Sequence, residues 1–114
     1  MKKFLLSVFA VCLFMTMVLV TQAMAEAKPT VLYIYGQSCG ACTRFEPTFD
    51  LARSKYSQKF NFQKEEYESS AKAKQLHVSE TPSVYILDGN KVQKIDWSCL
   101  SNPGCLDKTL QSYQ

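Results

Sequence analysis

The sequence has almost no excess of charge of either sign. Its 114 residues carry 13 lysines and arginines against 10 aspartates and glutamates, a formal net charge of +3. Binding to nucleic acid or to an anionic membrane surface needs clustered basic charge, so this balance gives no electrostatic case for either partner. The sequence also lacks internal repeats, low-complexity tracts and internal linkers. A single domain is therefore the expected organisation.

The first 25 residues have the pattern of an export signal. Two lysines follow the initiating methionine, and a run without charge extends from Phe4 to Val20. Small residues at Ala23 and Ala25 occupy the two positions that a signal peptidase reads. We expect cleavage after Ala25, leaving residues 26–114 as a domain in the periplasm or another extracytoplasmic compartment. An uncleaved N-terminal membrane anchor is the alternative, because the charge-free run is at the lower limit of a membrane span.

Five cysteines are present in a chain with a single histidine. Cys12 lies inside the apolar run and is expected to be discarded with the signal. The other four would then work where disulfides persist. A domain of this size buries only about 60 to 70% of its unfolded surface, so a covalent crosslink would add needed stability.

Hydrophobic patterning predicts an α/β domain with the element order β-α-β-α-β-β-α, a mixed central sheet flanked by helices. The unbroken apolar run before Gly36 is typical of a central strand buried on both faces. The predicted strands cover residues 31–35, 60–62, 84–87 and 91–97. The predicted helices run from the first Cys-x-x-C cysteine to Tyr56, from Ala71 to Leu76 and from Pro103 to Tyr113.

Turn and cap residues give these predictions their boundaries. Ser69 or Ser70 can cap the second helix, and Asn102 followed by Pro103 predicts the start of the last one. Pro47 falls inside the first helix and is expected to kink it.

The motif Cys39-Gly40-Ala41-Cys42 lies at the predicted strand-to-helix junction. A helix N-terminus offers unpaired N–H groups and the positive end of a dipole, which stabilise a thiolate. Cys39 is therefore the expected nucleophile toward a substrate disulfide. Cys42, one helical turn later, is the expected resolving cysteine.

A Cys-x-x-C motif has three other interpretations. A haem attachment motif is excluded because Thr43 occupies the position of the required histidine. Zinc would need a second knuckle, but five residues separate Cys99 from Cys105 where two are usual. A purely structural disulfide at the junction is the third interpretation.

The sequence resembles the thioredoxin superfamily across nearly all of residues 30–114. Three features carry the resemblance: the Cys-x-x-C after a buried strand, Pro47 eight residues after Cys39, and the segment Leu76-His77-Val78-Ser79-Glu80-Thr81-Pro82. The resemblance implies a thioredoxin-like fold in which Pro82 is a cis-proline facing the cysteine pair. It also implies that the backbone of Thr81 pairs with a substrate chain. The Thr-Pro pair is more similar to exported reductases and isomerases than to cytosolic thioredoxin.

Two positions depart from that family pattern. Ser38 stands where thioredoxin has a tryptophan, and Tyr33 stands where it has a buried acid. That acid is the family's proposed proton acceptor for the resolving cysteine. Glu65, Glu66 or water could take its place. The single histidine, His77, is expected to be solvated at a helix end.

Two aromatic residues have alternative interpretations. Tyr35 and Trp97 are interpreted as core or rim packing, although either could form the floor of a substrate groove.

Cys99 and Cys105 are expected to form a second disulfide. The intervening loop contains Ser, Asn, Pro and Gly, so it can turn back and bring the two Cα atoms within bonding range. A structural crosslink is the main interpretation. The resemblance places Cys99 near the rim of the redox site, so a redox relay with Cys39 is the alternative.

The sequence therefore predicts an exported thiol-disulfide oxidoreductase that acts as a monomer without metal or cofactor. Its expected partners are thiols or disulfides of other exported proteins, and a membrane or periplasmic redox partner. Reduction, oxidation and isomerisation all stay open, because direction depends on the potential of the cysteine pair. A non-catalytic binding module or a zinc protein using the cis-proline groove is the alternative function.

Overall fold

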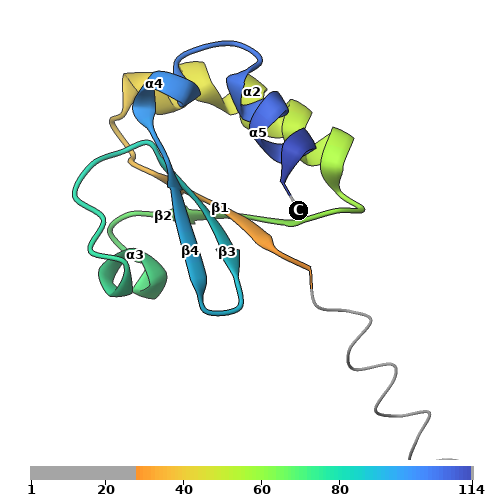
Figure 1. The fold of residues 1–114 in the computed structure, drawn as a ribbon. Helices are drawn as coiled ribbons and strands as arrows, with labels where there is room; N and C mark the ends of the chain where they lie inside the picture. Colours follow the sequence, from red (N-terminus) through yellow and green to blue (C-terminus); the bar gives the residue numbers. More distant parts are fainter. Residues whose placement is uncertain (1–27, 114) are drawn as a thin grey trace, which may run out of the picture.

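A computed structural model of the chain describes residues 28–113. The strands are β1 (Thr30–Tyr35), β2 (Asn61–Glu66), β3 (Ser83–Asp88) and β4 (Lys91–Ile95). The helices are α2 (Gly40–Tyr56), α3 (Ala71–Gln75), α4 (Trp97–Leu100) and α5 (Cys105–Ser112) (Figure 1). The expected export signal lies outside the described residues. Within residues 28–113, no helix is long and apolar enough to cross a membrane.

The four strands form one mixed sheet in the order β2-β1-β3-β4. β1 and β2 are parallel, and the pairs β1–β3 and β3–β4 are antiparallel. The helices cover both faces: α2, α4 and α5 lie on one side of the sheet and α3 on the other (Figure 1). This confirms the predicted α/β fold with helices flanking a mixed sheet.

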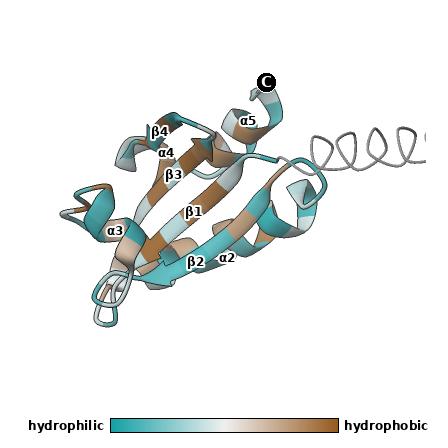
Figure 2. Cartoon of the chain, turned by 90° about the horizontal axis from the view of Figure 1, so that it is seen from below, coloured by the Kyte–Doolittle hydropathy of each residue, from teal (hydrophilic) through white to brown (hydrophobic). Residues whose placement is uncertain are grey.

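β1 is buried on both faces, as its unbroken apolar sequence predicts. Val31 and Tyr33 pack into a hydrophobic cluster with residues of α2 and α5. Leu32 and Ile34 pack into a second cluster, which contains residues of α3 and of the segment that follows it. All four side chains have no exposed surface. Figure 2 shows the contrast with the edge strand β2, which is mostly hydrophilic. The central strand therefore fixes both layers of the domain relative to each other.

The helix α2 begins at the predicted position and buries an apolar stripe with helical spacing. Cys39 is its N-cap residue, and Phe45, Phe49 and Ala52 are buried against the sheet. The helix continues past Pro47 to Tyr56 as one element. The shorter helix α3 is capped by Ser70, whose side chain accepts a hydrogen bond from the Ala73 N–H, as predicted.

The predicted boundaries near the C-terminus are wrong in two places. β4 ends at Ile95, and Asp96 becomes the N-cap of a four-residue helix that contains Trp97. The last helix was expected to begin at Pro103, but it begins at Cys105, because Asn102 closes a turn and does not cap the helix. The reason is local: the Cys105 N–H donates to the Asn102 carbonyl, and Gly104 takes a left-handed conformation with φ 88°. Glycine adopts that conformation without steric cost.

Candidate active site

The candidate site forms where four strand ends meet. β1, β2 and β4 run in the same direction, and β3 runs in the opposite direction. The C-terminal ends of β1, β2 and β4 therefore lie at the same edge of the sheet as the N-terminal end of β3. The segments that follow β1, β2 and β4 therefore gather around the segment that precedes β3. Across the sheet they follow the order Glu66–Glu68, Cys39, Thr81–Pro82 and Trp97.

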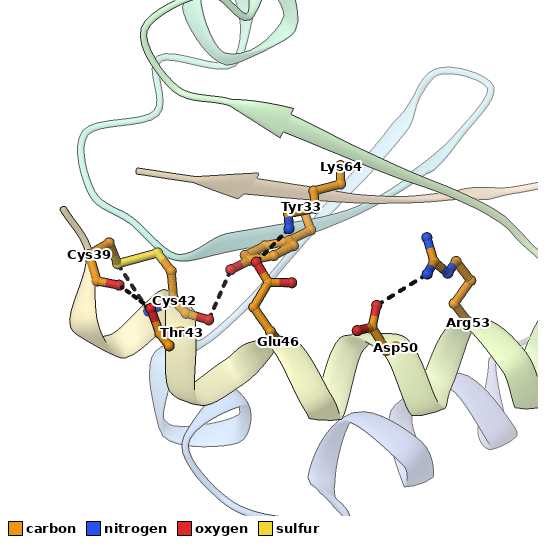
Figure 3. Close-up of polar contacts among 8 residues, drawn as sticks. All are labelled: Tyr33, Cys39, Cys42, Thr43, Glu46, Asp50, Arg53 and Lys64. Atoms are coloured by element: carbon orange, nitrogen blue, oxygen red, sulfur yellow. Dashed lines mark hydrogen bonds and ion pairs between the residues drawn. A yellow bond between two sulfur atoms is a disulfide. The ribbon is translucent and has the colours of Figure 1, made fainter. Parts of the chain in front are cut away.

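Cys39 and Cys42 form a disulfide at the N-terminus of α2, with their Cα atoms 5.2 Å apart. The Cys39 Sγ accepts a hydrogen bond from the Cys42 N–H at 3.0 Å, and the Thr43 hydroxyl donates to the Cys39 carbonyl at 3.3 Å (Figure 3). Cys42 is buried and 3% exposed, whereas Cys39 is half-buried. In the dithiol state, the backbone N–H and the helix dipole favour negative charge on the accessible Cys39 sulfur.

An open cleft of about 830 Å³ lies beside Cys39. The residues that line it include Gly40 and Ala41 of the motif, Glu66 and Thr81. The Thr81–Pro82 peptide bond is cis. Because the cleft joins the cysteine motif to this loop, a bound chain could contact both at once.

Gly36 allows these two loops to approach, a role that the sequence analysis missed. A Cβ atom added at Gly36 would lie 2.9 Å from Thr81 Oγ1 and 3.5 Å from the Cβ of Cys39. Cβ atoms in proteins essentially never come within 3.0 Å of a heavy atom from a residue that is not their neighbour in the chain. The glycine at the end of β1 was the available signal, but its neighbour in space is 45 residues away in the sequence.

Tyr33 occupies the position where the family resemblance expects a buried acid. Its hydroxyl donates a hydrogen bond to the Cys42 carbonyl oxygen at 3.2 Å (Figure 3). Burial, and then the nearby negative charge of Glu46, raise the pKa of Tyr33 well above its usual value. The hydroxyl therefore stays protonated at neutral and at moderately alkaline pH and donates to the backbone of Cys42.

Glu46 and Lys64 form an ion pair next to Tyr33, with 2.5 Å between Nζ and Oε1. The Lys64 Nζ also lies 4.7 Å from the ring centroid of Tyr35 and 5.8 Å from that of Tyr33. Glu46 was not predicted as a site residue, although its position four residues after Cys42 places it on the same helical face. Tyr35 is half-buried and packs against the core cluster that contains Tyr33, which is one of the two roles expected for it.

The two glutamates considered as substitutes for the buried acid differ in placement. Glu65 accepts a hydrogen bond from the Ser70 hydroxyl at 2.5 Å, which ties it to the start of α3. Glu66 lines the cleft that contains Cys39. His77, the single histidine, is exposed directly after α3, as expected.

Trp97 lies on the other side of the cis-proline loop. It is 47% exposed at the start of α4 and lines a hollow of about 190 Å³ together with Ala41, Thr81 and Pro82. The prediction that Trp97 belongs to the edge strand is wrong, because β4 ends two residues earlier. Its place beside Pro82 agrees with the groove interpretation.

Cys99 and Cys105 are joined by a disulfide with an S–S distance of 2.04 Å. The bond connects α4 to α5, and the Cys99 sulfur lies 3.7 Å from the Thr109 hydroxyl oxygen. Neither cysteine lines the cleft beside Cys39. In the described part of the chain, no three or more His, Cys, Asp or Glu side chains come together in a group that could hold a metal ion.

Comparison with models of known protein families identifies the family of this chain. The family model described as Thioredoxin matches residues 15–108. The chain belongs to the thioredoxin family. Members of this family are generally thiol-disulfide oxidoreductases, and the Cys39–Cys42 disulfide agrees with such redox chemistry. A comparison with curated protein sequences gives no match.

Solved thioredoxin structures resemble this family member in fold at low sequence identity. The germline-specific thioredoxin Deadhead of Drosophila melanogaster is 20% identical, with a TM-score of 0.65 over 87% of this chain and 94% of that one. Mitochondrial thioredoxin 3 of Saccharomyces cerevisiae is 20% identical, with a TM-score of 0.64 over 85% and 90%. Thioredoxin of Fasciola hepatica is 16% identical, with a TM-score of 0.65 over 83% and 91%.

Proposed function

We propose that this thioredoxin-family protein is an exported thiol-disulfide oxidoreductase that exchanges disulfides with cysteines of other extracytoplasmic proteins. One observation carries the proposal: the half-buried Cys39 sulfur accepts the Cys42 N–H at the start of α2, beside an open cleft. That arrangement supports a reactive thiolate at Cys39 and a sheltered second sulfur at Cys42.

The exchange proceeds in two balanced steps. The Cys39 thiolate attacks one sulfur of a partner disulfide, forming a mixed disulfide and releasing the other partner sulfur as a thiolate. Cys42 loses its proton to solvent and attacks the Cys39 sulfur, which closes the Cys39–Cys42 bond and releases the second partner thiolate. Two electrons pass to the partner, and the reverse sequence oxidises partner thiols.

The roles of the two cysteines are tested by trapping. Cys42→Ser should accumulate covalent mixed disulfides with partner proteins, because the second step is lost, whereas Cys39→Ser should trap none. Reduction of insulin by the wild-type protein provides the activity measurement. Equal trapping by both variants, or insulin reduction by Cys39→Ser, would contradict the assignment.

The direction of exchange is tested by the reduction potential of the Cys39–Cys42 pair, measured against glutathione. A potential of about −270 mV, the value of thioredoxin, favours a reductase, whereas one of about −120 mV favours an oxidant. The reduction potential distinguishes the two directions, because a difference of about 30 mV changes the free energy of a two-electron exchange by 1.4 kcal/mol.

Export is supported by the N-terminal charge and hydropathy pattern and by the Cys99–Cys105 disulfide, a bond type that persists outside reducing compartments. Mass spectrometry of the protein expressed from its full gene tests this part. A mature chain beginning at Glu26 in the extracytoplasmic fraction is the expected result. A full-length chain in the membrane fraction would support the N-terminal anchor, and a full-length chain in the cytoplasm would contradict export.

A further inference from the structure

The two sides of the Cys39 site differ in chemical character. The sheet order places the segment after β2 on one side of Cys39 and the segment after β4 on the other. The large cleft and the smaller hollow share only Ala41 and Thr81, so they meet at the point where the cysteine motif faces the cis-proline loop. A chain crossing this point would place neighbouring side chains in both depressions.

The β2 side is acidic. Glu66 is half-buried, lines the cleft beside Cys39, and forms no ion pair with any lysine or arginine among residues 28–113. Lys64, two residues before Glu66 in β2, forms its ion pair with Glu46 on α2. Glu68 lines the same cleft, although it also borders a second hollow next to Lys74. The cleft walls include no basic residue.

The β4 side is apolar and electrically balanced. Trp97 exposes 47% of its surface beside Pro82 and Ala41. The one acid that lines this hollow, Glu80, pairs with Lys94 at 3.2 Å. An exposed tryptophan next to a proline offers contact area to a large apolar side chain.

We propose that the preferred partner is an extended protein segment whose reactive cysteine lies between a basic and a large apolar side chain. The basic side chain contacts Glu66, the apolar one packs between Trp97 and Pro82, and the cysteine sulfur meets Cys39. This substrate preference rests on the proposed disulfide exchange and uses the same two steps. It follows from charge complementarity on one side and apolar contact on the other.

Four disulfide-linked peptide homodimers test the preference. The first has arginine before the cysteine and phenylalanine after it, and the second has the same residues in reversed order. The third replaces arginine with glutamine, and the fourth replaces phenylalanine with alanine. Homodimers make both sulfurs of each disulfide equivalent. The first two have identical composition and charge, so a difference between their rates reports placement and not general attraction.

The measured quantity is the second-order rate at which fully reduced protein opens each disulfide. One order of arginine and phenylalanine is expected to react about fivefold faster than the reversed order, consistent with one ion pair and one aromatic contact. Starting from the faster order, replacement of either flanking residue should lower the rate about two- to threefold.

Matched variants assign the effect to each side. Glu66→Gln should lower the ratio of the arginine peptide's rate to the glutamine peptide's rate, and Asp50→Asn, which removes the same charge from the exposed surface of α2, should not. Trp97→Ala should lower the ratio of the phenylalanine peptide's rate to the alanine peptide's rate. Leu51→Ala provides the control for loss of an exposed apolar residue, because Leu51 is 68% exposed on α2.

Hydroxyethyl disulfide, which is small and uncharged, separates this inference from the proposed function. Equal rates for the two peptide orders, with hydroxyethyl disulfide still reduced, would overturn the substrate preference and leave the exchange activity in place. Failure to reduce hydroxyethyl disulfide and all four peptides would overturn the exchange activity itself. An effect of Asp50→Asn as large as that of Glu66→Gln would also overturn the preference, because it would reflect overall charge.

Discussion

The hydroxyl of Tyr33 donates a hydrogen bond to the backbone carbonyl oxygen of Cys42, 3.2 Å away. This bond links the central strand to the first turn of the helix that carries the cysteine pair. Tyr33 has no exposed surface, and its ring packs edge-on against Phe45 with 5.0 Å between the ring centroids. The backbone of Cys42 is therefore held from the core side of α2, whereas Cys39 lines the cleft.

We predict that Tyr33→Phe lowers the free energy of unfolding of the oxidised protein by about 1 kcal/mol, the usual net contribution of one hydrogen bond. The ring and its packing are retained, so the loss reports the hydroxyl alone. Urea denaturation measures it. Tyr85→Phe is the control, since Tyr85 is buried on the opposite face of the sheet. An equal loss in both variants would contradict a specific role for the bond to Cys42.

The stability difference between wild type and Tyr33→Phe should depend on pH. Burial raises the pKa of Tyr33 in the folded protein, whereas a tyrosine in the unfolded chain has a pKa of about 10. A raised folded-state pKa means that the stabilising contribution is complete below about pH 10. It is lost as the pH rises above that value, because ionisation stabilises the unfolded chain. The free energies of unfolding of the two proteins, measured from pH 8 to 11, should therefore converge as the pH rises. A difference between them that does not change with pH would show that Tyr33 does not contribute to the pH dependence of stability.

Most of the fold could be predicted from local sequence. The strand at residues 31–35 has an apolar run long enough to be buried on both faces, and the stripe of α2 repeats with helical periodicity. The start of α5 was predicted two residues too early, because Asn102 and Pro103 have the composition of a helix cap. The disulfide between Cys99 and Cys105 and the left-handed Gly104 close a turn there instead.

Local sequence pattern predicted the site only where its residues are close in sequence, and the approach of Thr81 and Pro82 to the cysteine motif was expected from the family resemblance alone. Cys39 and Cys42 act within one helical turn, so their spacing was sufficient. To predict the ion pair of Glu46 with Lys64, one would need to know the register between β1 and β2 and the face of the sheet on which α2 packs. The position of Trp97 beside Pro82 requires knowing that β4 is the strand next to β3. Neither relationship has a local pattern.

The second disulfide is predicted to be a structural crosslink between α4 and α5. Removing it with Cys99→Ser/Cys105→Ser should lower the free energy of unfolding by about 2 kcal/mol, the amount expected from loop entropy for so short a loop. Turnover of hydroxyethyl disulfide should stay near the wild-type rate, because neither cysteine lines the cleft beside Cys39. Chemical denaturation and the turnover assay are the two measurements.

Graded reduction distinguishes this crosslink from a redox relay. A crosslink should stay oxidised at potentials that fully reduce the Cys39–Cys42 pair, as followed by alkylation and mass spectrometry. A relay would instead show lost turnover with unchanged stability in the double variant. That result would assign electron transfer to Cys99.

Gly36 is predicted to be required for the approach of the cis-proline loop to the cysteine motif. Gly36→Ala places a methyl group 2.9 Å from Thr81 Oγ1, so the Thr81 side chain or its loop has to move. The variant should open disulfides about tenfold more slowly, corresponding to about 1.4 kcal/mol in the barrier. Stopped-flow measurement with hydroxyethyl disulfide gives the rate of the first step.

The cause of that loss can be tested by removing the clashing atom. Thr81→Ala deletes Oγ1 and keeps the backbone that is expected to pair with substrate, so Gly36→Ala/Thr81→Ala should recover most of the lost rate, a positive coupling between the two sites. Gly40→Ala provides the matched control for stability, since its added Cβ would meet only the Arg44 guanidinium, at 3.7 Å. Gly40 is the first residue of α2, directly after the N-cap Cys39, so alanine there should raise the free energy of unfolding by less than the roughly 0.5 to 1 kcal/mol that separates the two residues inside a helix. If the double variant reacts as slowly as Gly36→Ala alone, a clash with the Thr81 side chain is not the cause of the lost rate.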